Sequence, residues 1–191
     1  MELITKARAL EWCREHGIAV ATASVDASRL TFGHPMHGLR VDITGPPSDV
    51  LALVYVLVMT GIPDDDERHF NGAMIWLRDW DIGSCGAEAV GYALAQGLRG
   101  TGGATPSVLE QPAHLVADDE FVLARAMLAL PMLFRWDAVF VPAHGLFLAS
   151  VSHHEHLDIY FRDGRLEPKL RKRFEAGGYP VHGLGVVQGE V

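Results

Sequence analysis

The chain has 191 residues, of which 49% are hydrophobic and 21% are charged, a composition that is typical of a folded domain and excludes a disordered chain. The length predicts one globular domain, residues 1–191, with enough sequence to bury a large core. The formal net charge of −8 argues against nucleic acids and anionic membranes as partners, and it is compatible with a basic protein partner.

The N-terminus carries no recognisable targeting signal, because residues 1–6 lack the charged and then apolar arrangement of a signal peptide. The longest apolar run, residues 50–59, is ten residues long, whereas a membrane-spanning helix needs roughly 20. Cys13 and Cys85 are the only cysteines and do not suggest a disulfide framework. We therefore expect a soluble, cytoplasmic protein.

The N-terminal part of the chain predicts a helix followed by strands. Leu3, Ala7, Leu10 and Cys13 lie at helical spacing, and Gly17 suits the end of that helix. The following stretches are rich in small and β-branched residues, and they predict strands at residues 18–25, 30–32 and 39–44.

A buried helix is expected next. Pro46-Pro47-Ser48-Asp49 is a helix-start signal in which Ser48 is the expected N-cap. The apolar run that follows could form a strand or a helix by its pattern alone. Its length, together with Gly61 and Pro63 just beyond it, favours a helix that is buried on nearly all sides.

The most informative stretch is Ala73-Met-Ile-Trp-Leu-Arg-Asp-Trp-Asp-Ile82. Its side chains alternate between two faces that both begin apolar, which predicts a central strand over residues 73–80 that is buried on both sides. Towards its C-terminal end this strand becomes charged, so that Arg78 lies between Trp76 and Trp80 on one face.

The second half of the chain predicts two longer helices and several strands. One helix is expected over about residues 85–98, and Asp118 begins another, which Pro131 should kink or split. Strands are expected at residues 114–116, 138–141, 146–151 and 157–161, and a short helix at residues 168–174.

These elements together predict an α+β fold in a single domain, with a mixed or largely antiparallel sheet packed against helices. The C-terminal residues 162–191 combine a basic segment with a loose tail that begins at Gly177-Gly178. Within residues 162–175, basic residues outnumber acidic ones by three.

The cluster of Trp76, Arg78 and Trp80 has two interpretations. It could form an aromatic pocket in which Arg78 binds an anion or a partner's carboxylate. Alternatively, Arg78 is a core residue that packs between the indoles and pairs with an acid, for which Glu88 and Asp137 are the candidates. We favour the structural interpretation, because tryptophans at alternating strand positions usually belong to a core.

Two further groups contain residues that could support chemistry. His153-His154-Glu155-His156, with Asp158, is rich in metal-ligand types, but adjacent residues of one turn point in different directions and the spacing matches no zinc motif. We therefore expect a polar turn without a metal ion. Cys85, at the expected start of a helix, would have a lowered thiol pKa there, but no base can be assigned to it, and we predict that it is not catalytic.

The chain resembles an uncharacterised family of bacterial hypothetical proteins. The resemblance rests on Ile75-Trp-Leu-Arg-Asp-Trp-Asp-Ile82, then Glu88 and Tyr92, then Pro112-Ala-His-Leu115, Trp136-Asp137, and Ser152-His153 with Glu155 and Asp158. It covers roughly residues 72–163 and implies no known activity. The binding candidates are Trp76, Arg78, Trp80, Glu88, Asp137, His153, Glu155 and Asp158.

We therefore expect a non-catalytic binding or interaction protein with an acidic surface and with neither cofactor nor metal. A neutraliser of a basic toxin, of the immunity-protein type, is one version of this prediction, based on size and acidity alone. The alternative is a small-molecule hydrolase that uses Cys85 or a pair formed by a histidine and a carboxylate.

Overall fold

The computed structural model describes residues 1–16, 18, 20–21, 31–60, 70–78, 87–100, 106–108 and 110–190. Within these residues, nine strands form one sheet in the order β1-β5-β4-β6-β7-β8-β3-β2, and β9 pairs with β3. All of these pairs are antiparallel. The strands are β1 (Glu2–Ile4), β2 (Val20–Ala21), β3 (Thr31–Asp42), β4 (Ala73–Arg78), β5 (Ala113–Val116), β6 (Asp137–Pro142), β7 (Phe147–Ser152), β8 (His156–Phe161) and β9 (Val181–Glu190).

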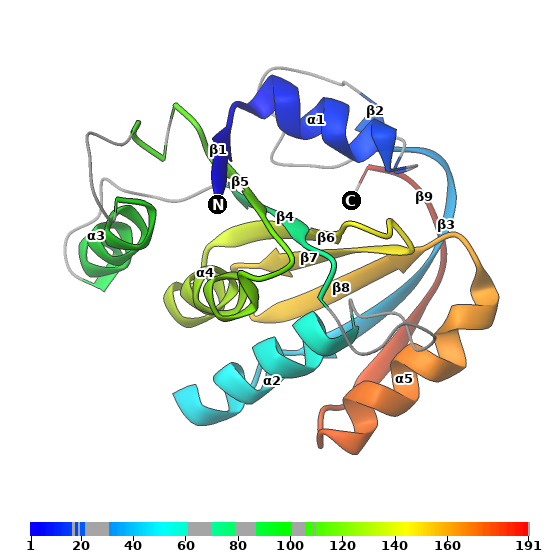
Figure 1. Ribbon diagram of the computed structural model, residues 1–191. Coiled ribbons are helices and arrows are strands. Elements are labelled where there is room, and N and C mark those ends of the chain that lie inside the picture. Colours follow the sequence, from blue (N-terminus) through cyan, green and yellow to red (C-terminus); the bar gives the residue numbers. More distant parts are fainter. Residues whose placement is uncertain are drawn as a thin grey trace.

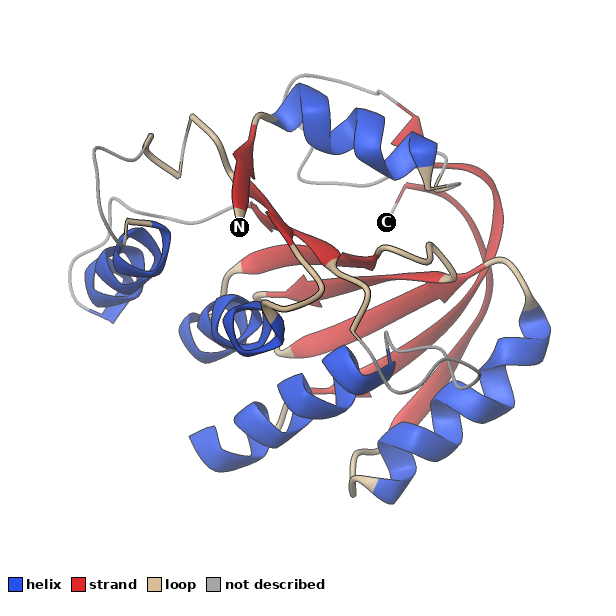
Figure 2. Ribbon diagram, viewed as in Figure 1, coloured by secondary structure: helices blue, strands red, loops and turns tan. Residues whose placement is uncertain are grey.

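Helices cover the two faces of this sheet unequally (Figure 1). Three helices, α2, α4 and α5, lie on one face, whereas α1 crosses the other near the top of the view. The same division is plain when the chain is coloured by secondary structure (Figure 2). The helices are α1 (Lys6–Glu15), α2 (Pro47–Thr60), α3 (Ala87–Arg99), α4 (Phe121–Phe134) and α5 (Glu167–Ala176), and a 3-10 turn, η1 (Gly164–Leu166), precedes α5. The predicted α+β class with a largely antiparallel sheet is confirmed.

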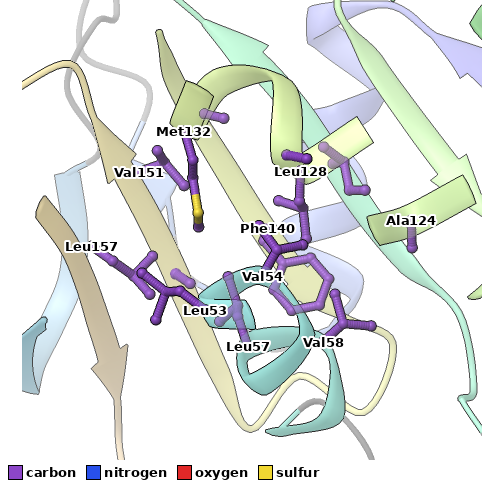
Figure 3. Close-up of a cluster of buried hydrophobic side chains, with 14 of the residues drawn as sticks. Leu53, Val54, Leu57, Val58, Ala124, Leu128, Met132, Phe140, Val151 and Leu157 are labelled. Carbon is purple, nitrogen blue, oxygen red and sulfur yellow. The ribbon is translucent and has the colours of Figure 1, made fainter. Parts of the chain in front are cut away.

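The larger apolar core lies between the sheet and the three helices. Apolar side chains of α2 and α4 meet those of β6, β7 and β8 there (Figure 3). The helix α2 buries side chains against both the sheet and α4, but it is not buried on nearly all sides as its sequence predicted, because Leu51 and Tyr55 are 46% and 44% exposed. The residues that lie at the centre of this cluster include Leu53, Leu57, Leu128, Phe140 and Leu157.

A smaller apolar cluster lies on the opposite face, beneath α1. Trp12 and Cys13 of α1 pack with Met74, Trp76 and Tyr160 of the strands. Burial in this cluster raises the pKa of the Cys13 thiol to about 12, so Cys13 is an unreactive thiol near neutral pH.

The helix α3 packs against the end of α4 and the loop that follows it. Gly91 makes this contact possible, because a Cβ atom at this position would lie 2.7 Å from the indole of Trp136 and 2.8 Å from the ring of Phe134. The rings of Phe134 and Trp136 stack, with their centroids 5.6 Å apart, so that α3 packs on a flat aromatic surface.

Several expectations from the sequence are wrong. Ser48, the expected N-cap, is the second residue of α2, which begins at Pro47. Residues 30–32 and 39–44 were expected to form separate strands, but β3 is continuous from Thr31 to Asp42. Pro131 was expected to kink or split its helix, and it does not split it, because α4 continues to Phe134. Pro131 lies in the last turn, where it removes one hydrogen bond, and burial of its neighbours Leu130 and Met132 offsets that loss.

Another correction concerns the C-terminus, which was expected to be a loose tail. Residues 181–190 form β9, which pairs with β3 along most of its length and has two register shifts. Residues 37–41 of β3 pair with both β8 and β9, so the two lie on opposite sides of β3. The strand β9 satisfies the N–H and C=O groups that β3 would otherwise expose at an edge.

Candidate functional site

Polar side chains gather at one end of the sheet face that α2, α4 and α5 do not cover. Because side chains alternate along a strand, the register places Arg78 of β4 opposite Asp137 of β6 on the same face. By the same rule, Ser150 and Ser152 of β7 lie opposite Asp158 and His156 of β8. Four neighbouring strands therefore contribute polar groups to one surface.

These polar side chains surround a small cavity of about 120 Å³. Two of the charged groups in its wall are largely buried, since Arg78 and Asp158 are 7% and 6% exposed. The lining residues are Arg78, Asp137, Ser150, Val151, Ser152, His156, Asp158 and Tyr160, which we call the polar pocket.

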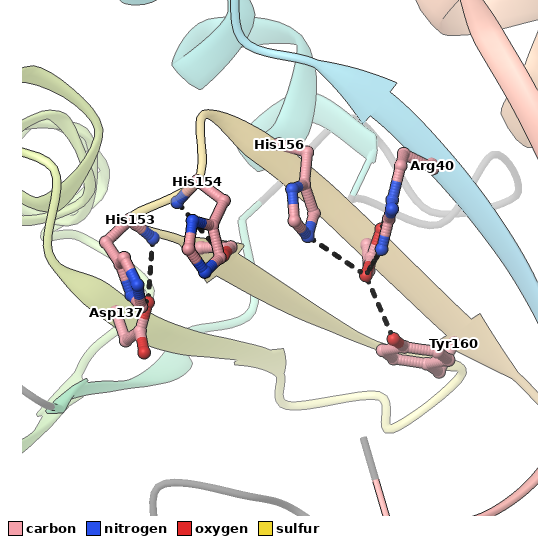
Figure 4. Close-up of polar contacts among 8 residues, drawn as sticks. Arg40, Asp137, His153, His154, His156 and Tyr160 are labelled. Atoms are coloured by element: carbon pink, nitrogen blue, oxygen red, sulfur yellow. Dashed lines mark hydrogen bonds and ion pairs between the residues drawn. The ribbon is translucent and has the colours of Figure 1, made fainter.

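The Asp158 carboxylate accepts three side-chain hydrogen bonds in the wall of the polar pocket. Arg40 on β3 donates from Nε to Oδ1 and from Nη2 to Oδ2, both at 2.7 Å, and the Tyr160 hydroxyl donates to Oδ2 at 3.1 Å. His156 Nε2 lies 3.5 Å from the same oxygen. Figure 4 shows Arg40, Tyr160 and His156 converging on this carboxylate from three sides.

The hydrogen bonds at Asp158 have consequences for its neighbours. The pKa of the Arg40 guanidinium is raised because it donates hydrogen bonds to the carboxylate. The pKa of Tyr160 is raised well above its ordinary value by burial and by the nearby negative charge of Asp158. Tyr160 therefore stays a neutral hydrogen-bond donor, and the Arg40–Asp158 pair is a fixed part of the pocket wall.

Asp137 is held by the turn between β7 and β8. The backbone N–H of His153 donates to Asp137 Oδ1 at 2.7 Å, and His153 Nδ1 lies 2.9 Å from the same oxygen (Figure 4). Among the contacts of the described residues, none uses Asp137 Oδ2. Asp137 thus keeps one oxygen with acceptor capacity in the wall of the polar pocket.

Arg78 connects the polar pocket with the apolar cluster beneath α1. Its Cζ atom lies 5.9 Å from the ring centroid of Trp76, which is 3% exposed. The guanidinium thus lies against the indole, as the sequence predicted, and it also forms part of the pocket wall. Asp137, one of the two acids expected near Arg78, lies opposite Arg78 in the register of β4 and β6.

The histidine-rich turn is held by its own backbone contacts. The amide of His154 donates to Ser152 Oγ at 3.2 Å, and the amide of Glu155 donates to the Ser152 carbonyl at 3.0 Å. Glu155 has a φ of 63° and pairs with Arg135 at 2.6 Å, away from the pocket lining. In the part of the chain that the structure describes, no group of three or more His, Cys, Asp or Glu residues is arranged to hold a metal ion.

The structure brings together some of the sequence candidates and not others. Arg78, Asp137 and Asp158 line the polar pocket, His153 supports it through Asp137, and Trp76 lies against Arg78. Trp80 and Cys85 lie outside the described residues, as does the side chain of Glu88.

Comparison with known proteins gives no relative. No protein-family model, curated protein or solved structure matches this chain. The resemblance based on the Trp-Leu-Arg-Asp-Trp-Asp-Ile frame therefore stays a prediction, and the function has to be argued from the site itself.

Sequence reasoning did not place Arg40, Ser150 or Tyr160 at the site, and it considered His156 only as part of the turn. A usable signal was present in β8, where His156, Asp158 and Tyr160 alternate with Leu157, Ile159 and Phe161. That alternation separates a polar face from an apolar one. The partner Arg40 carries no such signal, because its pairing with Asp158 follows from strand order alone.

A second buried polar group, at His114, lies apart from the polar pocket. His114 is fully buried on β5, where it faces Ile75 across the strands and its Nδ1 lies 3.1 Å from the Ile75 carbonyl oxygen. Burial and the nearby Arg99 lower the pKa of His114 to about 4. His114 is therefore neutral at physiological pH and donates to Ile75 from Nδ1.

None of the described helices has the length and apolar character needed to cross a membrane.

Proposed function

We propose that this protein is a non-catalytic binding protein and that the polar pocket receives one polar group of its partner. The observation that carries this proposal is the burial of an arginine head group, Arg78, in the wall of a cavity opposite a carboxylate, Asp137. Buried charge contributes little to stability, because desolvation cancels much of the gain from pairing. Charges fixed around a cavity are well suited to recognise a partner.

The hydrogen-bonding capacity of the pocket indicates the kind of group that it binds. Arg78 supplies N–H donors, Asp137 Oδ2 is an acceptor, and the hydroxyls of Ser150 and Ser152 can act as either. A group that accepts and donates at once, such as a carboxamide, complements both charges. A group with a single charge would face a like charge across the cavity, at an energetic cost.

The size of the cavity favours a side chain of a protein partner over a free small molecule. Its volume of about 120 Å³ is below the roughly 300–1,000 Å³ that is typical of small-molecule pockets. A single side chain inserted into a desolvated pocket is a common anchor of protein interfaces. The net charge of −8 would speed association with a basic partner, so the immunity-type neutraliser stays one version of this proposal.

The experiment uses nuclear magnetic resonance, with the amide of His153 as a reporter because it donates directly to Asp137. Three probes of similar size, acetamide, acetate and acetamidinium, are titrated into the whole chain. We expect acetamide to shift the amide signals of His153 and Ser152 more than either ion does. Ser150→Val, which replaces the hydroxyl by a methyl group and adds a second one, should abolish the shifts, and Ser107→Val should keep them. Equal shifts in both variants contradict the proposal.

One observation favours hydrolysis as a second candidate function. His156 Nε2 lies 3.5 Å from Asp158 Oδ2, and His156 is opposite Ser152 in the strand register. The hydroxyl of Ser152, the imidazole of His156 and the carboxylate of Asp158 therefore belong to neighbouring residues of β7 and β8. A carboxylate that orients a histidine base beside a serine is the arrangement of hydrolytic triads. Turnover of a panel of fluorogenic esters that both Ser152→Ala and His156→Gln abolish would replace the binding proposal. Cys85→Ser should leave any activity unchanged.

A further inference from the structure

Two histidines at the polar pocket each contact one of its two carboxylates (Figure 4). His153 Nδ1 lies 2.9 Å from Asp137 Oδ1, and His156 Nε2 lies 3.5 Å from Asp158 Oδ2. Histidine is the side chain whose charge ordinarily changes between about pH 5 and about pH 8. The charge at the pocket therefore changes with pH under conditions in which its aspartates and arginines keep theirs.

The two histidines act on the pocket from different positions. His156 is half-buried and belongs to the pocket lining, so a proton on it adds a positive charge to the wall itself. His153 is exposed in the turn between β7 and β8 and reaches Asp137 from outside the lining. A proton on His153 turns this contact into an ion pair, which offsets the negative charge that Asp137 presents to the cavity.

Other charged groups surround these two histidines. Asp42 of β3 lies opposite His156 in the strand register and pairs with His182 of β9 at 3.2 Å. The ring centroid of His154 lies 3.9 Å from that of His153, and two charged imidazoles at this distance repel each other. Among the described residues, the titratable and charged groups around His153 and His156 are Arg40, Asp42, Arg78, Arg135, Asp137, His154, Glu155, Asp158, Tyr160 and His182.

We propose that the polar pocket binds a carboxylate of its partner when His153 and His156 are protonated, so that its ligand changes from a carboxamide near neutral pH to a carboxylate in acid. This inference rests on the proposed function, since it concerns the same pocket. Positive charge added at these two positions lowers the energetic cost of an anion in the cavity and raises that of a cation. The direction of this change is the same however the existing charges of the pocket are paired.

The size of the pocket favours a carboxylate over a larger anion. A carboxylate is planar and nearly as large as a carboxamide, so one cavity of about 120 Å³ accommodates either group. Both of its oxygens accept hydrogen bonds, and the hydroxyls of Ser150 and Ser152 can donate them. A long polyanion would extend beyond the pocket and meet a chain whose net charge is −8. The partner group that fits the acid form is therefore a single aspartate or glutamate side chain.

The test compares the affinities of acetate and acetamide for the whole chain at about pH 7.5 and about pH 5.5, with the Ser152 amide as the nuclear magnetic resonance reporter. Acetate stays largely ionised at the lower pH, because ordinary carboxyl groups titrate near about pH 4. Each titration is run at constant pH in a buffer without carboxylates, so that protonation of the histidines does not add to the shift. We expect acetate to bind at least about tenfold more tightly at the lower pH and acetamide to gain less than about threefold.

Three variants identify the source of the gain. His156→Gln removes the charge from the pocket wall and should reduce the gain of acetate affinity on acidification to less than about threefold. The matched control is His182→Gln, which should keep the full gain, because His182 also pairs with an aspartate but lies outside the pocket lining. His153→Gln leaves the lining itself intact and should reduce the gain in part, and it replaces His156→Gln if that variant does not fold. Each readout is a ratio between two pH values of one variant, so a loss of affinity common to both pH values does not affect it.

Several outcomes would overturn the inference. One is a gain of acetate affinity that is as large in His156→Gln and His153→Gln as in the parent. Another is binding of acetamide at about pH 7.5 without any gain for acetate at about pH 5.5, which would leave the proposed function in place. A larger gain for inorganic phosphate than for acetate would assign the acid form to a different anion. If neither probe binds at either pH, the inference and the proposed function are both wrong.

Discussion

The two faces of the sheet use the same strands for different purposes. At the end of the sheet where the polar pocket lies, the helix-covered face stays apolar, with Leu77, Ala138, Val151 and Leu157 in the core. Their immediate neighbours in the sequence, including Arg78, Asp137 and Asp158, face the other way. Adjacent residues of one strand thus belong to the core and to the candidate site, respectively.

This contrast shows how the fold accommodates a polar site without weakening its core. Alternation gives each face its own set of residues, so the helix-covered face can be optimised for packing alone. The opposite face divides along its length, from the apolar cluster beneath α1 to the polar pocket at the strand ends. We expect substitutions on the helix-covered face to affect stability, and those at the polar end to affect binding more than stability.

The largest expected effect is in the main core. Phe140 is fully buried on the helix-covered face and packs among Val54, Val58 and Leu128 (Figure 3). Phe140→Ala should lower the free energy of unfolding by about 3–5 kcal/mol, because it removes a large side chain and leaves a cavity. Urea unfolding followed by circular dichroism measures the change, and the exposed Val122→Ala on α4 is the control. A loss below about 1 kcal/mol would contradict the assignment of this face as the core.

The second prediction concerns His114, a polar group buried beside Ile75. Its pKa is about 4 in the folded protein and about 6.5 in the unfolded chain, so the unfolded chain binds the proton first as the pH falls. The stability that this histidine contributes is complete above about pH 6.5 and is lost as the pH falls towards about 4. The expected loss is about 3 kcal/mol.

Urea unfolding at about pH 7 and about pH 4 measures this loss. His114→Gln removes the titrating group and should lose correspondingly less stability than the parent between the two pH values. The exposed His182→Gln removes a histidine without a buried environment and should behave as the parent does. If His114→Gln and the parent lose the same amount, His114 does not cause the acid sensitivity.

Arg78 has a structural role in one interpretation of the sequence and a binding role in the other. Substitutions of Arg78 therefore test whether the polar end of the sheet contributes to stability. Arg78→Lys keeps the charge but loses the planar guanidinium that lies against the Trp76 ring. We expect the variant to lose about 1–3 kcal/mol of stability and Arg78→Ala to lose more. Denaturant unfolding of both variants tests this. If both unfold as the parent does, Arg78 has no structural role and acts only in the pocket.

The sequence predicted the elements whose signals are local. Helix-start residues identified α2 and α5, the length of the apolar run favoured a helix for α2, and alternation identified β4. It did not predict β9, because Gly183 and Gly185 interrupt the alternation and its pairing with β3 is a long-range contact. The polar pocket was only partly predictable for the same reason. Arg78 and Asp137 are marked by their neighbours, whereas Arg40 reaches Asp158 through a strand pairing between residues 118 positions apart.

The smallest expected effect separates the two faces at neighbouring positions of β7. Ser150 lines the polar pocket, and no hydrogen bond to its hydroxyl occurs among the described residues, whereas Ala149 is fully buried in the main core. Ala149→Ser buries a hydroxyl in apolar surroundings and should cost about 1–3 kcal/mol. Ser150→Ala should change stability by no more than about 0.5 kcal/mol, because no contact among the described residues depends on that hydroxyl. Melting of the two single variants and of the double variant, in which the residues are exchanged, measures both effects. A loss from Ser150→Ala as large as that from Ala149→Ser would mean that the polar face is part of the structural core. A loss confined to Ala149→Ser would show that the Ser150 hydroxyl is not part of the structural core.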